Sequence, residues 1–133
     1  MVLDVAGLAR LLDDLVVAKS VYDLVKLGHN PSTLYRRLGW LVEHGFVNVI
    51  DDGGVRRYHL TGLGARLYEV LMEALLYRAT RLLEERGVRN RVWWGDERVR
   101  AVRPVIYVDR KVEIPLNLEG LVEVRLDERA AKH

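Results

Sequence analysis

The stretch from Ser20 to Leu60 decides the fold, and it reads SVYDLVKLGHNPSTLYRRLGWLVEHGFVNVIDDGGVRRYHL. It opens with Ser20 and Asp23 in an S-x-x-D box, which is the signature of a capped helix start. This helix is expected to stop at Gly28, because glycine adopts the left-handed conformation of a helix end without strain. Pro31 then occupies the first position of a second helix, where its missing N–H costs nothing. The spacing predicts two helices joined by a tight turn, the second over about residues 31–44.

A two-stranded ribbon follows the second helix, which is expected to end at Gly45. The strands are predicted over Val47–Ile50 and Val55–Leu60, around a hairpin turn of four residues or slightly fewer at Asp51–Gly54. Two helices joined by a tight turn are a common way to present the second helix to the major groove of DNA, and a ribbon behind them forms a wing. Residues 1–60 are therefore expected to form a winged helix-turn-helix domain.

Three short motifs support this interpretation. PSTLYRR, HGF and RRYHLT follow one another in the sequence, and together they resemble the DNA-binding core of the PadR, ArsR and MarR-like winged helix-turn-helix regulators. The resemblance covers about residues 5–86. It implies double-stranded DNA as the partner and a pseudo-palindromic operator as the target. In such proteins a helix that follows the wing often forms the dimer contact.

Regular patterns extend the domain on both sides. Asp4 can cap a helix over about residues 5–15, whose leucines recur at helical spacing. Val16–Val17 is short and β-branched, as expected of a small strand. On the other side, Thr61 caps a long helix that reaches about Arg86, with Gly87 as its stop.

Residues 88–133 change in character. Val105–Val108 and Val112–Ile114 flank a polar turn as a predicted hairpin, and residues 122–126 alternate between apolar and charged, as in a half-buried strand. The segment is too short for an independent core, so we expect it to pack on the helical body or on a second chain. The predicted fold class is α+β, with a DNA-binding domain over 1–60, a dimerisation helix over 61–87 and a β-rich segment over 88–133.

One face of the second helix is placed to read DNA. At about 100° per residue, the leucines at 34, 38 and 41 form a core stripe, and Arg36 points outward opposite them. An arginine fork matches guanine O6 and N7, while serine and threonine hydroxyls suit phosphate or either base. On an isolated helix these arginines would indicate only a solvated face, but the basic wing behind them favours DNA. The expected DNA-binding residues of this helix are Ser32, Thr33, Tyr35, Arg36 and Arg37, of which Tyr35 and Arg37 are better placed for the backbone.

The wing adds Arg56 and Arg57 just after its tip. Arginines there can enter the minor groove or clamp phosphate. Asp51 and Asp52 at the same tip would repel phosphate, so the tip itself is not expected to insert deeply. Trp40 leaves two interpretations open, because DNA or protein could cover its exposed ring.

The long helix carries an apolar arc wider than one small domain covers. The surplus surface favours a homodimer formed through the same helix of a second copy. The alternative is that residues 88–133 fold back over the helix. The expected dimer contacts are Leu71, Leu75, Leu76, Leu82 and Leu83.

Composition excludes several classes of function. The chain has 133 residues, no cysteine and a net charge of +2, so disulfides, thiolate catalysis and histone-like DNA coating are not expected. No apolar run is long enough for a membrane span, and no signal peptide pattern is present, so a cytoplasmic location is the default. Arginine exceeds lysine and glutamine is absent, which indicates a thermophilic source.

No residue pattern indicates an enzyme, a cofactor or a metal site. The four histidines are scattered, and no nucleophile–histidine–acid set or phosphate-binding loop appears. The leading interpretation is a dimeric, sequence-specific transcriptional regulator. A winged-helix protein-interaction module and an architectural chromatin protein are the alternatives. The target sequence, any small-molecule effector and the choice between activation and repression cannot be read from these residues.

Overall fold

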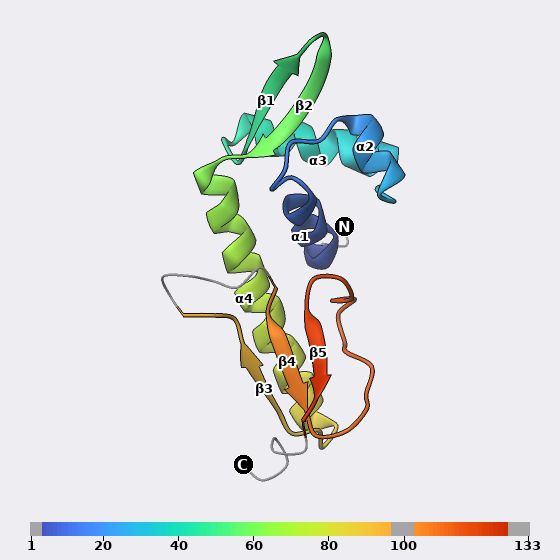
Figure 1. Cartoon of the computed structure of the whole chain (residues 1–133), viewed down its shortest axis with the longest axis vertical. Helices are drawn as coiled ribbons and strands as arrows, with labels where there is room; N and C mark the ends of the chain where they lie inside the picture. Colours follow the sequence, from blue (N-terminus) through green and yellow to red (C-terminus); the bar gives the residue numbers. More distant parts are fainter. Residues whose placement is uncertain (1–3, 97–102, 128–133) are drawn as a thin grey trace. The chain divides into compact units, whose positions relative to one another are not determined.

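The computed structural model describes residues 4–96 and 103–127 (Figure 1). The chain divides into two compact units, Met1–Met72 and Glu73–His133. The first unit contains α1 (Val5–Asp14), α2 (Val21–Lys26), α3 (Pro31–Glu43), β1 (Val47–Asp52), β2 (Val55–Leu60) and the start of α4 (Gly62–Glu85). The second unit contains the end of α4 and the strands β3 (Asn90–Trp93), β4 (Val105–Val108) and β5 (Glu123–Leu126).

The helices of the first unit start and stop where the sequence predicts. The Ser20 hydroxyl accepts from the Asp23 amide, and the Asp23 carboxylate accepts from the Ser20 amide, both at 3.1 Å. These two bonds complete the predicted capping box of α2. At the far end of α3, Gly45 has a φ of +79°, and the Phe46 amide donates to the Leu41 carbonyl at 2.9 Å. This closes the helix as glycine-terminated helices commonly close.

A continuous leucine core holds these helices together. Leu34, Leu38 and Leu41 of α3 are each no more than 2% exposed, and they pack with Leu24 of α2 and with the leucines of α1. Burial of one such side chain contributes about 1.5–3 kcal/mol. The predicted core stripe of α3 is thus confirmed, and it fixes which face of this helix points outward.

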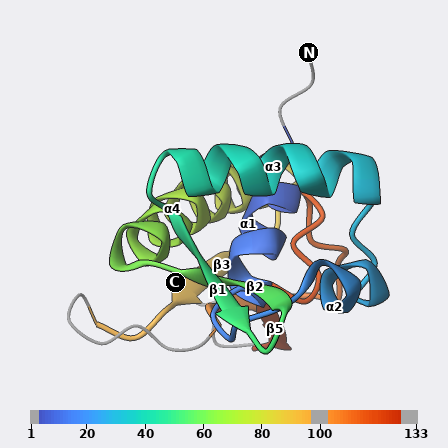
Figure 2. The ribbon, with the colours of Figure 1, turned by 90° about the horizontal axis from the view of Figure 1, so that it is seen from above.

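The wing is a longer hairpin with a tighter turn than predicted. Strands β1 and β2 pair over six residues each, from Val47 opposite Leu60 to Asp52 opposite Val55. Only Gly53 and Gly54 form the turn, both with positive φ, which is the geometry of a two-residue type I′ turn. The two preceding aspartates therefore belong to β1. In Figures 1 and 2 the wing leaves the C-terminal end of α3.

A short third strand segment completes the wing, but it is not Val16–Val17. Those two valines lie in a turn and are more than half exposed, so the prediction of a strand there is wrong. Two residues later, Lys19 pairs with Tyr58 of β2 through two backbone bonds of 2.9 and 2.7 Å. The chain needs those two residues to leave α1 before it can reach the edge of β2. The resulting architecture is α+β and compatible with a winged helix-turn-helix.

Helix α4 begins at a tightly packed turn. The Thr61 hydroxyl donates to the Gly45 carbonyl at 2.7 Å and accepts from the Gly64 amide at 3.0 Å. The same residue therefore caps α4, as predicted, and ties it to the end of α3. At its other end, Gly87 has a φ of +77° and the Val88 amide donates to the Leu83 carbonyl, so the predicted stop is also confirmed.

The apolar arc of α4 is largely covered within one chain. Leu75, Leu76 and Leu83 are each no more than 7% exposed, while Leu71 and Leu82 are half-buried. This corrects the expectation for Leu75, Leu76 and Leu83, because a side chain buried in its own chain cannot also line a contact between chains. The expected dimer contacts at Leu71 and Leu82 stay a prediction. The exposed large apolar residues of α4 are Leu63, Val70 and Tyr77.

The sheet of the second unit has the order β3-β4-β5, with β3 antiparallel and β5 parallel to the central strand. The predicted hairpin between Val105–Val108 and Val112–Ile114 is therefore wrong. Both edges of β4 are occupied by β3 and β5, so Val112–Ile114 has no strand to pair with and lies in the connection before β5. The strand predicted at 122–126 is found as β5, but its half-buried alternation is not, since Val124 and Leu126 are 41% and 63% exposed.

One prediction tests the packing at the start of α4. An ideal Cβ on Gly64 would clash with the Phe46 carbonyl oxygen, so Gly64→Ala should lower the free energy of unfolding by about 1–3 kcal/mol. Gly62→Ala is the matched control, because nothing lies within 4 Å of a Cβ at that position. Denaturant melts of both variants measure the difference. Equal stability of the two variants would contradict the packing described.

A second prediction concerns pH. Hydrogen bonds from the Ser20 amide and hydroxyl lower the pKa of Asp23 below its ordinary value of 3.8, helped by Arg57 with Nη1 at 3.3 Å. A lowered pKa stabilises the fold above the ordinary value, and this stabilisation is lost as pH falls through the lowered value. The melting temperature of wild type should therefore exceed that of Asp23→Asn at neutral pH and approach it as the pH falls through the lowered pKa of Asp23. A difference independent of pH would show that the charge of Asp23 does not stabilise the fold.

Candidate nucleic-acid interface

The outward face of α3 is made of small and charged residues. Ser32, Arg36, Gly39 and Glu43 are exposed on the side of the helix opposite the buried leucines. Arg36 makes no ion pair with any residue in the ranges 4–96 and 103–127, so its five N–H donors are available to a ligand. This face can therefore offer a planar cation from the middle of a helix.

The other predicted contacts at the start of α3 differ in availability. The Ser32 hydroxyl donates to Asn30 Oδ1 at 2.7 Å, which leaves its oxygen as an acceptor. Thr33 is half-buried, whereas Tyr35 is 62% exposed. Ser32 and Tyr35 are thus accessible, and Thr33 is less so.

Arg37 is not free. Its Nη2 lies 3.4 Å from Oδ2 of Asp4, the residue that caps α1, and its side chain is 25% exposed. The structure therefore uses this arginine to tie α3 to the start of α1. The sequence could not show this partner, because the two residues lie 33 positions apart.

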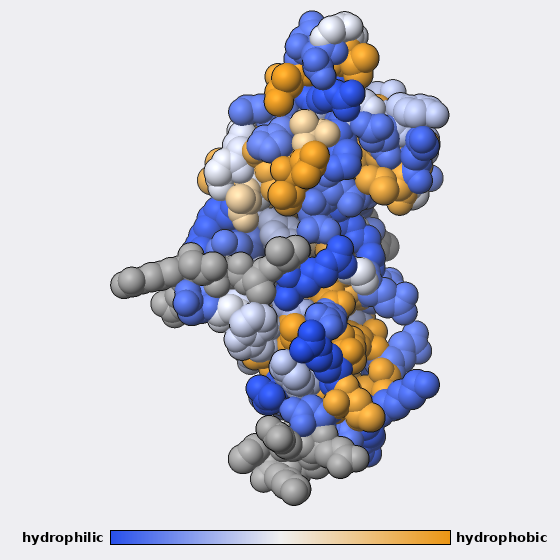
Figure 3. All heavy atoms as spheres, in the orientation of Figure 1, coloured by the Kyte–Doolittle hydropathy of each residue, from blue (hydrophilic) through white to orange (hydrophobic). Residues whose placement is uncertain are grey.

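The two wing arginines have opposite environments. Arg57 lies within 3.3 Å of two carboxylates, Asp52 on β1 and Asp23 on α2, so its charge is locally neutralised. Arg56 faces the other side of the ribbon, is exposed and makes no ion pair within the described part of the chain. Apolar and hydrophilic residues lie side by side on the wing in Figure 3, and its valines and isoleucine at 49, 50 and 55 are each at least 40% exposed. Of the two predicted wing residues, Arg56 is the one that can reach a phosphate.

Trp40 packs on its own chain, although 46% of it stays exposed. Its ring stacks on His44 at 4.5 Å and on Phe46 at 5.6 Å, and the His44 Nδ1–H donates to the Trp40 carbonyl at 2.8 Å. These contacts hold the indole at the C-terminal end of α3. Of the two expected covers for Trp40, DNA and protein, contact with its own chain therefore accounts for part of the ring surface.

One exposed pair on α2 was not found from the sequence. Lys26 lies 5.1 Å from the centre of the Tyr22 ring, and Tyr22 is 70% exposed. In a helix-turn-helix the first helix crosses the DNA backbone, where a lysine can contact phosphate. The i, i+4 spacing of an aromatic and a basic residue was the signal available for it.

The described residues give no support to two other kinds of site. No group of three or more metal-binding side chains occurs within residues 4–96 and 103–127. Over the same residues, no helix has the length and apolar character needed to cross a bilayer.

Comparisons with known proteins add little. No protein-family model matches the chain, and no curated protein matches it either. Among solved structures, the chain is similar to the one titled "Crystal structure of SSV1 F-93", with 26% identical residues and a TM-score of 0.43. The match covers 56% of this chain and 87% of that chain. A TM-score this low does not establish a shared fold, so the assignment of a winged helix-turn-helix rests on the helices, wing and strand pairing described above.

Proposed function

We propose that this chain is a sequence-specific transcriptional regulator that binds double-stranded DNA as a homodimer, related to the PadR, ArsR and MarR-like proteins. Helix α3 lies in the major groove, and the wing lies on the flanking backbone or in the minor groove. The observation that carries the proposal is Arg36, an arginine without an ion pair in the described chain, on the exposed face of a helix whose other face is fixed by buried leucines. The proposal places the protein in the cytoplasm and assigns it no catalytic activity and no cofactor.

The small residues beside Arg36 support close contact with DNA. Gly39 lies in the middle of α3, exposed, with nothing within 4 Å of a Cβ at that position. Glycine costs about 1 kcal/mol relative to alanine in a helix interior, and no contact inside the unit requires it. A backbone that approaches a ligand closely is one of the standard reasons for glycine. Gly39 and Ser32 would let α3 sit deep enough in the groove for Arg36 to reach guanine.

The wing contributes one cation under this proposal rather than two. Arg56 is available for phosphate, whereas Asp52 and Asp23 hold Arg57. On α2, Lys26 supplies a second contact to the backbone. Because one DNA-binding domain makes so few phosphate contacts, its affinity should depend only weakly on salt concentration. This is one reason for proposing two DNA-binding domains per operator. Two domains that read successive major grooves would lie about 34–36 Å apart.

The alternatives make different predictions for binding. An architectural chromatin protein would bind all duplexes with similar affinity, and a protein-interaction module would bind none of them. Duplexes selected by the protein from a random pool, titrated at several salt concentrations beside an unselected duplex, separate these functions. A selected duplex bound no better than the unselected one would overturn the proposed function.

Substitution of single arginines tests the assigned roles. Arg36→Ala should cost about 1–3 kcal/mol of binding to the selected duplex and relax the preference at one base position. Arg56→Ala should weaken all duplexes alike and reduce the salt slope by about one. Arg57→Ala is the matched control, since carboxylates already neutralise it, and should change binding least. If Arg57→Ala weakened binding more than Arg36→Ala, the orientation of α3 and the wing on DNA would be wrong.

A glycine substitution should separate binding from stability. Gly39→Ala should raise the melting temperature, because alanine favours the helix by about 1 kcal/mol, and should weaken binding to the selected duplex. Gly62→Ala, at another helix position open to solvent, should leave binding unchanged. Calorimetry and fluorescence anisotropy on the same samples measure both effects. A Gly39→Ala variant that binds as tightly as wild type would remove Gly39 from the interface.

A further inference from the structure

Strand β3 has one edge that no other strand of the described residues covers. It is the outer strand of the sheet β3-β4-β5, and the Asp109 amide donates to the Arg89 carbonyl at 3.0 Å. Because bonded and non-bonded pairs alternate in an antiparallel ladder, Arg91 and Trp93 also bond toward β4. Asn90 and Val92 then point their backbone N–H and C=O groups away from the sheet. These groups have no backbone partner among residues 4–96 and 103–127.

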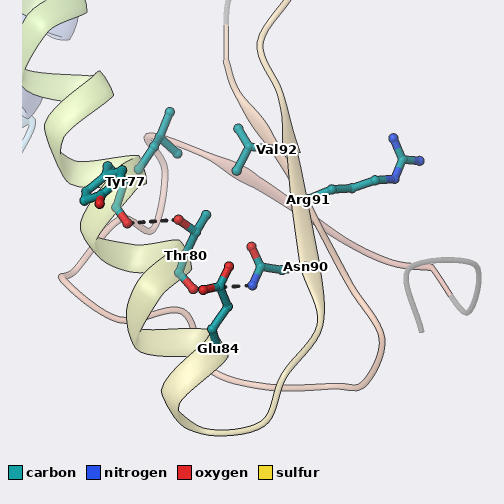
Figure 4. A pocket seen from close by; sticks show the side chains of 7 residues that line it. Tyr77, Thr80, Glu84, Asn90, Arg91 and Val92 are labelled. Carbon is teal, nitrogen blue, oxygen red and sulfur yellow. Dashed lines mark hydrogen bonds between the residues drawn. The ribbon is translucent and has the colours of Figure 1, made fainter. Parts of the chain in front are cut away.

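A hollow of about 330 Å³ lies along this edge, between β3 and α4 of the same unit. Asn90 and Val92 point into it from the strand, and Arg91 points away (Figure 4). The lining residues are Leu76, Tyr77, Thr80, Glu84, Asn90, Arg91 and Val92.

The polar groups at the base of this hollow are already bonded to one another. The Thr80 hydroxyl donates to the Tyr77 carbonyl at 2.9 Å, and the Asn90 side chain donates to the Thr80 carbonyl at 3.4 Å. The exposed surface beside them is mixed, since Tyr77 and Val92 are 68% and 37% exposed and the Glu84 carboxylate, 3.8 Å from Arg81, is 56% exposed. An incoming strand would thus find backbone groups without a partner in the described chain, and beside them a hollow lined by both apolar and polar side chains. This is the arrangement that binds an added β-strand.

We propose that the occupant of this edge is β3 of a second copy, paired antiparallel about a two-fold axis. The two sheets then form one continuous sheet, with the two α4 helices on the same face. This interface would hold together the homodimer of the proposed function, on which it rests, but it is inferred from the geometry of the second unit alone.

Charge selects a second copy in one register. A two-fold axis that keeps the free groups facing each other can pass through residue 90, 91 or 92. An axis at residue 90 places Arg89 opposite Arg91 of the second copy, and an axis at residue 91 places Arg91 opposite itself. Like charges directly opposite are destabilising. An axis at Val92 instead places each Arg91 opposite Trp93 of the other copy.

In the register centred on Val92, the exposed side chain of Trp93 lies against Arg91 of the other copy. Trp93 is 50% exposed, and an arginine over an indole is a favourable cation–π pair. In its own chain Arg91 lies 4.1 Å from the centre of the Tyr107 ring and bonds Asp127 at 3.2 Å, so it is held along the outer face of the sheet. On the inner face, the two Val92 side chains meet beside Tyr77 and fill part of each hollow.

The other edge of the sheet provides a matched control. The Glu123 amide donates to the Pro104 carbonyl and the Asp127 amide to the Val108 carbonyl, so Val124 also points its N–H outward from β5. Its exposed fraction of 41% is close to the 37% of Val92. Proline at either position removes an N–H that no strand among residues 4–96 and 103–127 uses, and edge strands tolerate such a proline.

Sedimentation of the full chain at micromolar concentration tests the surface. Wild type and Val124→Pro should sediment as dimers and Val92→Pro as a monomer with an unchanged circular dichroism spectrum. Trp93→Ala should weaken association about tenfold through loss of two cation–π contacts. A monomeric wild type, or a Val92→Pro variant that still dimerises, would overturn the proposal.

Cysteine cross-linking covers the case in which the proline variant does not fold. The chain has no cysteine, so a single introduced cysteine can form a disulfide only with the same cysteine of the second copy. The Cα atoms of a bonded antiparallel pair lie about 5.5 Å apart, within the range of a disulfide. Val92→Cys should form a covalent dimer under mild oxidation, while Asn90→Cys and Val124→Cys should not. Cross-linking of either control in place of Val92→Cys would overturn the register.

Binding of each variant to a half-site duplex is measured separately. A monomeric Val92→Pro variant should bind the half-site like wild type. Loss of dimers and loss of DNA binding are therefore distinguishable.

Discussion

The burial of three leucines on α3 is the constraint on which the candidate interface depends. Leu34, Leu38 and Leu41 lie in the core with α1 and α2, and each contributes about 1.5–3 kcal/mol through burial. A rotation of α3 by one residue position would expose part of this stripe and bury charged groups in its place. The direction of Arg36 is therefore not a property of that side chain. It follows from the leucines on the opposite side of the helix.

Carboxylates elsewhere in the first unit decide which arginines are available. Asp4 holds Arg37, and Asp23 with Asp52 holds Arg57. Four arginines cluster in the sequence of α3 and the wing, yet two of them serve the fold. The basic surface is consequently narrow, which agrees with a net charge of only +2. A narrow surface favours selective over indiscriminate binding of a polyanion.

Local signals in the sequence were sufficient for the helices and the wing, because caps and glycine stops act over three to six residues. The capping box at Ser20 and the stop at Gly45 belong to this class. Partners distant in the chain are not predictable in this way, and most of the corrections concern such partners. Arg37 meets Asp4 across 33 positions, Lys19 pairs with Tyr58, and β3 with β5 occupies both edges of β4. The sequence shows that the apolar arc of α4 is wider than one small domain covers, but it does not show that residues of the same chain bury most of this arc.

Helix α4 begins in one compact unit and ends in the other, with the boundary between Met72 and Glu73 inside it. A helix is costly to nucleate and cheap to extend. Once Thr61 and Gly64 fix its first turn, the portion that carries Leu75 and Leu83 is an extension of a helix that already exists. The second unit thus needs no helical nucleus of its own. Because synthesis proceeds from the N-terminus, the ribosome releases this template before the strands that pack on it.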